Sequence, residues 1–130
     1  MAKDERVDEH AAWHGTLDHE RLDAYRVAVE LDELVARLAR QGSRGQAWLF
    51  DQAQRASGST VLNLAEAIGR DGADRARCLK IASGSALEVD AAMTLLEHRG
   101  LCPSTIRPRA RQLVGRVAAM LTKMMNRAIR

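Results

Sequence analysis

The last third of the chain carries the side chains best suited to chemistry, because it holds many bases and no acids. Residues 98–130 contain eight arginines and lysines and no aspartate or glutamate. Guanidinium and ammonium groups neutralise phosphates, and several of them on one surface attract a polyanion. We expect nucleic-acid contacts from six of these bases. They are Arg107, Arg109, Arg111, Arg116, Lys123 and Arg127.

The opposite charge gathers at the start of the chain, and this leaves a second interpretation open. Residues 1–33 contain ten acids and four bases, while the whole chain of 130 residues has a net charge of +3. An acidic first helix also attracts a basic last helix, in the same subunit or in a neighbouring one. The charge pattern therefore fits either a nucleic-acid surface or a protein-interaction scaffold.

The polar residues in the middle of the chain do not form a recognisable catalytic set. Asn63, Glu66 and Glu88 lie in otherwise apolar stretches, and buried polar groups need partners. We expect an internal network or a subunit contact, with Asn63 level with Lys80 and Glu66 opposite an arginine of the following helix. No Ser, Cys or Lys stands beside a base with a third orienting group, so we do not expect an enzyme. A pocket in which Asn63, Glu66 and Glu88 converge would reverse this expectation.

Metal and cofactor sites are not predicted either. His10 and His14 have the i, i+4 spacing of a helical metal pair, but the glutamate of the zinc-protease motif is missing. Bundles that hold two metal ions use Glu-x-x-His pairs, and none occurs. Cys78 and Cys102 have no metal-ligand spacing, so we expect reduced thiols, with Cys78 serving in packing. We expect no cofactor.

The composition favours helices as the elements that position these side chains. Hydrophobic residues make up 46% of the chain and aromatic residues only 3%, with two prolines. A core of Leu, Ala, Val, Ile and Met suits helix packing. There is no apolar run of about 18 residues and no secretory signal pattern, so we expect a cytoplasmic protein without a membrane partner.

Four helices are predicted, at about 19–41, 45–68, 73–99 and from near 104 or 108 to 128. Short connections make successive helices antiparallel, so the fold class is all-α, an up-down antiparallel four-helix bundle over 17–130 after a polar arm at 1–16. Asp18 and Ser43 are expected caps, and Gly42 a left-handed stop. Trp48 and Leu62 fall in the apolar line of the second helix. The third helix has a regular seam of Leu79, Ala82, Ala86, Val89, Met93 and Leu96.

The tetrapeptide ASGS occurs twice, at 56–59 and 82–85. Gly58 and Gly84 lie 13 residues before and after Asp71, the centre of the intervening turn, so an antiparallel hairpin brings them to the same height. We predict a seam where small residues let two helices approach closely; the alternative is a glycine-lined ligand surface. The predicted structural motif comprises Ser57, Gly58, Ser59, Asn63, Glu66, Ser83, Gly84, Ser85 and Glu88.

Two stretches, Gln54–Arg70 and Cys78–Met93, resemble the small bacterial four-helix bundle proteins known as ribosomal RNA intervening-sequence proteins. The shared pattern includes Arg55-Ala56, Ser59, Asn63-Leu64-Ala65-Glu66, Gly84-Ser85 and Glu88, and the stretch Leu22–Val35 resembles the first helix of that family. The resemblance covers roughly residues 20–128. Ala67 stands where the family usually has glycine, which favours a continuous helix at that point.

The resemblance implies a left-handed up-down bundle that commonly assembles as a homopentameric ring. More distantly, the chain is similar to the accessory protein of diversity-generating retroelements, a basic pentameric bundle that binds nucleic acid and a reverse transcriptase. We therefore predict a non-enzymatic homo-oligomer that binds RNA or DNA through its basic last helix. The alternative is a scaffold for a protein partner, assembled through its acidic first and basic last helices.

Overall fold

A computed structural model describes residues 15–42 and 44–128. They form a 3-10 turn η1 (Asp18–Arg21), helix α2 (Asp23–Arg40), a 3-10 turn η2 (Arg44–Gln46), and helices α3 (Ala47–Ile68), α4 (Gly72–His98) and α5 (Arg107–Ala128). The expected cap Ser43, the histidines His10 and His14, and most of the expected polar arm lie outside the described residues. The domain boundary at residue 16 therefore stays a prediction.

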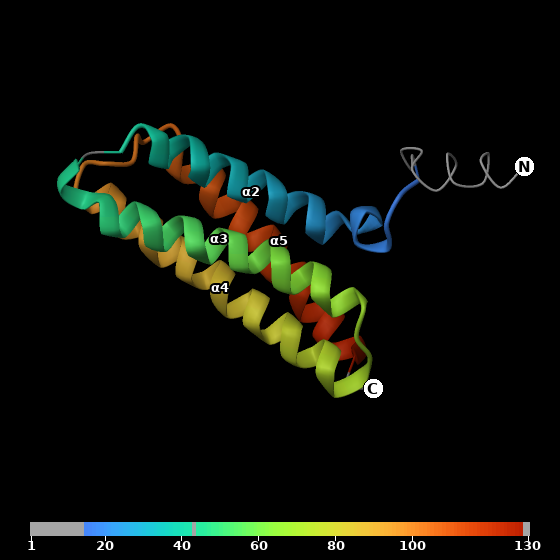
Figure 1. The fold of residues 1–130 in the computed structure, drawn as a ribbon. Helices are drawn as coiled ribbons and strands as arrows, with labels where there is room; N and C mark the ends of the chain where they lie inside the picture. Colours follow the sequence, from blue (N-terminus) through green and yellow to red (C-terminus); the bar gives the residue numbers. More distant parts are fainter. Residues whose placement is uncertain (1–14, 43, 129–130) are drawn as a thin grey trace, which may run out of the picture.

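The four helices form the predicted all-α bundle. Each helix packs on two others: α2 contacts α3 and α5, and α4 also contacts α3 and α5. The diagonal pairs, α2 with α4 and α3 with α5, do not pack on each other in the described part of the chain. Figure 1 shows successive helices running in opposite directions. None of the described helices is long and apolar enough to cross a bilayer.

The core lies along the bundle axis and consists almost entirely of aliphatic side chains. All six residues of the predicted α4 seam are fully buried. They pack with side chains from the other three helices, such as Leu31, Leu64 and Leu113. Phe50 is the aromatic residue of this core, at 4% exposure. The heptad-like spacing of α4 therefore identified its core face correctly.

The first helix begins later than predicted. Leu22 has an extended backbone (φ −83°, ψ 128°), which separates η1 from α2. Asp18 lies in the first turn of η1 after Leu17, and no side chain caps either element, so the predicted capping role is wrong. Leu22 packs against the core, which explains why the chain changes direction there.

Two glycines end helices for different reasons. Gly100 ends α4 in the left-handed conformation, with φ +73°. Its amide donates to the Glu97 carbonyl, and the Leu101 amide donates to the Leu96 carbonyl. Gly42 does not have the predicted positive φ. A Cβ at Gly42 would lie 2.8 Å from the Phe50 ring, so this position needs glycine for space.

The repeated tetrapeptides meet at the predicted height, but their glycines do not form the contact. The Ser59 and Ser85 hydroxyls lie 2.8 Å apart across α3 and α4. An added Cβ at Gly58 or Gly84 would meet no atom within 4 Å. The prediction that these glycines let the two backbones approach is therefore wrong, because the serines face the seam and the glycines face outward.

Several large apolar side chains are exposed on α3 and α4, and one of them was predicted to face the core. Leu62 is 70% exposed, so it does not belong to the core line of α3. Leu87 (59%), Ile81 (41%) and Leu95 (43%) are exposed on α4. The helix α4 thus carries apolar side chains outside its buried seam as well as within it.

Glycine substitutions test this geometry. We expect Gly84→Ala to stabilise the isolated subunit by about 1 kcal/mol, because it improves helix propensity and meets open space. Gly42→Ala should destabilise it by about 1–3 kcal/mol, because the added methyl group overlaps Phe50. Urea unfolding of both variants measures the difference. A loss of stability in both would show that Gly84 is packed after all.

Candidate nucleic-acid interface

The six basic residues predicted on the last helix do not share one surface. Arg107 is 6% exposed and faces the bundle interior. Arg111 lies on the side of α5 near α4, since its guanidinium is 3.9 Å from Asp90. Arg109 lies on the other side, where it contacts Glu30 of α2. The α-helical period of about 100° per residue explains the division, because positions 109 and 111 differ by about 200°.

Arg107 is the main correction to the predicted contact set. Its Nη2 donates to Asp90 Oδ1 and to Thr94 Oγ1, each at 2.8 Å. The Thr94 hydroxyl in turn donates to the Asp90 carbonyl at 3.0 Å. With a side chain 7% exposed, Arg107 is held by α4 and is not available to a phosphate. It joins α4 to α5.

Arg109 is also engaged, but at the surface. Its Nη2 donates to Glu30 of α2 and its Nη1 to Gln112. Both partners of the ion pair remain nearly half exposed, so water and salt weaken it. The predicted attraction between an acidic first helix and a basic last helix is therefore present within one subunit, at this pair.

The remaining bases of α5 line one side of the helix. Arg116, Lys123 and Arg127, which we call the α5 stripe, are all exposed and follow Arg109 at intervals of seven, seven and four residues. Within the described residues none of the three forms an ion pair. An open recess between the last turns of α5 and the start of α2 includes Lys123 and Arg127 beside Asp23, with Met120 and Met124 among its lining residues.

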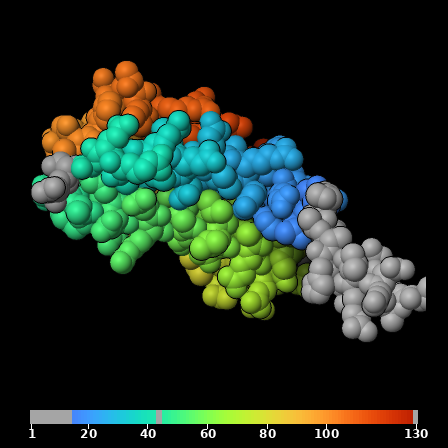
Figure 2. All heavy atoms as spheres, turned by 45° about the horizontal axis from the view of Figure 1, so that its top comes forward, coloured from blue at the N-terminus to red at the C-terminus, as the bar shows by residue number. Residues whose placement is uncertain are grey.

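Sequence reasoning missed the bases that the fold adds to those of α5. The α2–α3 and α4–α5 connections lie at the same end of the bundle (Figure 1), which brings the end of α2 near the start of α5. We call this the basic end. Figure 2 shows the teal end of α2 beside the orange segment that leads into α5. This end carries the exposed arginines Arg37, Arg40, Arg99 and Arg111, and among the described residues Arg111 has an acidic partner, Asp90, at 3.9 Å.

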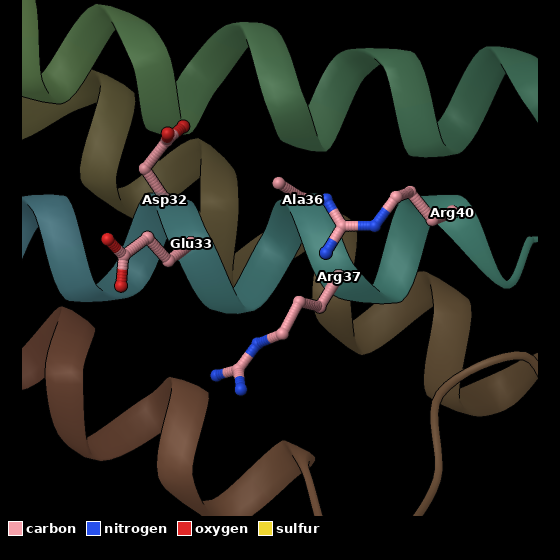
Figure 3. A pocket seen from close by; sticks show the side chains of 5 residues that line it. All are labelled: Asp32, Glu33, Ala36, Arg37 and Arg40. Atoms are coloured by element: carbon pink, nitrogen blue, oxygen red, sulfur yellow. The ribbon is translucent and has the colours of Figure 1, made fainter.

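Two of these arginines border a recess of about 350 Å³ on the outer face of α2. Asp32 and Glu33 line it one to two turns before Arg37 and Arg40. In Figure 3, Asp32 points toward α3 and Arg37 toward α5, while the Arg40 side chain extends back along the helix. The recess combines opposite charges and holds no hydroxyl, thiol or imidazole, so it offers polar binding rather than nucleophilic chemistry.

The serines of the predicted structural motif connect three helices. Ser57 is fully buried and donates to Asp32 of α2 at 2.7 Å. Ser59 meets Ser85 of α4, and Asn63 donates back to the Ser59 carbonyl and hydroxyl. The first tetrapeptide therefore faces both neighbours of α3. Ser83 is half-buried and Gly84 exposed.

The three polar residues proposed to converge make separate contacts. Asn63 turns onto its own helix, whereas Glu66 pairs with Arg70 at 3.1 Å, one turn away on α3. The predicted partner across the turn, Arg75, instead donates to the carbonyls of Ala67, Ile68 and Arg70 and so caps the end of α3. Glu88 is exposed.

The two cysteines are buried free thiols. Burial raises the pKa of the Cys102 thiol, and the nearby Arg107 charge opposes this only in part. A raised pKa disfavours the thiolate that nucleophilic or metal-binding chemistry needs. The described residues contain no group of three or more His, Cys, Asp or Glu side chains able to hold a metal ion.

A comparison with protein-family models gives a match. Residues 20–123 match the family model described as 23S rRNA-intervening sequence protein. A search of curated proteins finds no match to this chain. The matched range includes α2, α3 and α4 in full and most of α5.

Proposed function

The chain belongs to the 23S rRNA-intervening sequence protein family, and from this premise we propose that it is a non-enzymatic, oligomeric bundle that binds RNA or DNA through the basic end and the α5 stripe. The observation that supports this most strongly is the set of exposed bases without close ion pairs among the described residues. The basic end supplies three of them, Arg37, Arg40 and Arg99, beside the weakly paired Arg111, and the α5 stripe supplies three more. The further similarity to the retroelement accessory protein stays a prediction.

The proposed mechanism is phosphate neutralisation. Each Lys or Arg that contacts a phosphate releases a condensed counterion, so affinity falls steeply as salt rises. Compared with the six bases predicted from the sequence, the proposed surface lacks Arg107, held by Asp90 and Thr94, and Arg109, paired with Glu30. It adds Arg37, Arg40 and Arg99. A binding role also agrees with the separate contacts of Asn63 and Glu66, which leave no shared site for acid–base work.

Homo-oligomer formation is the second part of the proposal. Leu62 on α3 and Ile81, Leu87 and Leu95 on α4 expose large apolar surface, which is typical of interaction sites. The outward glycine Gly84 on the same helix allows close approach of another helix. The resemblance to the family suggests five subunits, which light scattering can count.

A protein-interaction scaffold remains the alternative, and the same exposed apolar side chains favour it. One of its ion pairs, Arg109 with Glu30, is already formed within the subunit and so is not available between subunits. The remaining charges of α5 would then serve assembly. Under this alternative, added salt weakens assembly and no nucleic acid binds.

Charge-removal variants test nucleic-acid binding. We expect glutamine at each residue of the α5 stripe to weaken binding to a short RNA duplex by about 10–100-fold at low salt, and to reduce the salt slope by about two to three. We expect the same loss of affinity and the same reduction of the salt slope for a variant with glutamine at Arg37, Arg40 and Arg111. Fluorescence anisotropy at several salt concentrations measures both quantities.

A matched control removes three exposed charges at the far end of the α3–α4 pair. These are Arg70, Arg77 and Lys80. This control should change affinity by less than about threefold, because its residues belong neither to the basic end nor to the α5 stripe. Equal losses in all three variants would point to net charge rather than a surface. No binding by the unsubstituted protein would overturn the proposed function.

A further inference from the structure

One exposed aromatic side chain lies at the basic end. Trp48, in the first turn of α3, is 54% exposed. The Arg99 guanidinium, from the end of α4, lies 5.3 Å from the centre of its ring. Arg99 is itself held by Gln46, whose side-chain oxygen accepts from Nη1 at 2.6 Å. The Arg99 guanidinium thus lies against the indole at the surface, and Gln46 fixes that guanidinium.

The arrangement contributes little to the stability of the subunit. Full burial of a large apolar side chain stabilises a protein by about 1.5–3 kcal/mol, but more than half of Trp48 stays in water. A cation–π contact at an exposed site adds only about 0.5–1 kcal/mol. The ring was predicted to belong to the apolar line of α3, and the fold leaves it outside the core. A ring that is ordered but uncovered is suited to an external ligand.

The chemistry around the ring favours a nucleotide. Aromatic rings and guanidinium planes are the surfaces on which proteins stack unpaired bases, and cations nearby neutralise the flanking phosphates. Arg99 donates through Nη1 to Gln46, and no other described partner uses its remaining N–H groups. Arg40 ends the neighbouring helix α2 at the same end of the bundle (Figure 1).

We propose that Trp48 and Arg99 stack one unpaired base of a single-stranded nucleic acid while the arginines of the basic end contact its phosphates. This inference rests on the proposed function and specifies its ligand. A single stacking site holds a base without reading a sequence, because every base has an aromatic face. The protein therefore prefers unpaired to fully paired strands of equal charge.

The test compares probes of nearly equal charge that differ in their bases. The probes are a twenty-nucleotide unpaired RNA, the same strand with abasic residues throughout, and a ten-base-pair RNA duplex. The protein is the full chain with Trp13→Phe, which makes Trp48 the sole tryptophan. We expect quenching of Trp48 fluorescence by the RNA strand and little quenching by the abasic strand. Removing the bases should weaken binding by about tenfold.

Substitutions at the ring then assign the effect. Trp48→Leu, which keeps apolar bulk, should weaken binding of the RNA strand about tenfold and leave duplex and abasic binding unchanged. Trp48→Phe should restore most of the loss. Leu17→Ala, at an exposed apolar position outside the basic end and the proposed subunit contacts, serves as the matched control and should have no effect on this preference.

The outcomes separate this inference from the proposed function. Equal affinity of Trp48→Leu and the parent for the RNA strand, with duplex binding intact, overturns the stacking site alone. A change in molecular mass by light scattering, with all three probes weakened equally, shows that Trp48 is a subunit contact and also overturns it. Failure of every probe to bind overturns the proposed function and this inference together.

Discussion

Replacing Asp90 with alanine is expected to lower the free energy of unfolding by about 3 kcal/mol. Asp90 is the carboxylate partner of Arg107, at 2.8 Å, in the interface between α4 and α5. Its removal leaves a guanidinium with a side chain 7% exposed and only Thr94 and the Asp90 carbonyl as acceptors. Breaking one side of a buried ion pair costs about 3–5 kcal/mol, and the partial exposure of Asp90 favours the low end.

Replacing the other partner of the ion pair, Arg107, should lower the free energy of unfolding much less. Arg107→Met fills a similar space without a charge, and Asp90 stays 27% exposed with Arg111 3.9 Å away. We therefore expect a loss of about 1 kcal/mol. Urea unfolding of the two single variants and the double variant measures the asymmetry. Equal losses for the two single variants would show that the ion pair itself is net stabilising and that the stranded Arg107 charge adds no further cost.

Replacing Leu79 with alanine is expected to cost about 3 kcal/mol. Leu79 has no exposed surface and lies in the α4 seam at the centre of the core. Deletion of a buried leucine side chain loses its transfer free energy and leaves a cavity, with a typical cost of 2–5 kcal/mol. The loss should appear as a lower urea midpoint with an unchanged slope.

Leu87→Ala provides the control on the same helix. Leu87 is 59% exposed in the subunit, so its truncation should change subunit stability by less than about 0.5 kcal/mol. Where the oligomer buries this side chain, the same variant should raise the concentration at which the oligomer dissociates. A stability loss as large as that of Leu79→Ala would mean that the burial pattern of α4 is wrong.

Periodicity predicted the parts of the fold that local rules govern. The 3 and 4 spacing of the α4 seam placed six residues in the core, and all six are fully buried. The turn near Asp71 and the stop at Gly100 follow from residues whose conformational preferences act over a few positions. Counting from the turn also placed the two tetrapeptides at the same height, because antiparallel helices rise equally on both sides, and Ser59 and Ser85 are in contact there.

Orientation about the helix axis was less predictable where a helix is apolar on more than one face. Gly84 and Ser85 differ by about 100° around α4, and small residues fit either the seam or the surface. Trp48 and Leu62 look like core residues by type alone, yet they are 54% and 70% exposed. Which apolar face becomes the interior depends on the partners, and no single helix contains that information.

The charged surface shows the same division between local and tertiary causes. The sequence alone determined an all-α bundle and a chain whose last third carries bases without acids. Tertiary structure decided that Arg107 turns inward to Asp90, that Arg109 pairs with Glu30, and that the end of α2 lies near the start of α5. Helix periodicity is a local property of the backbone, whereas the pairing of charges more than 50 residues apart depends on how the four helices pack.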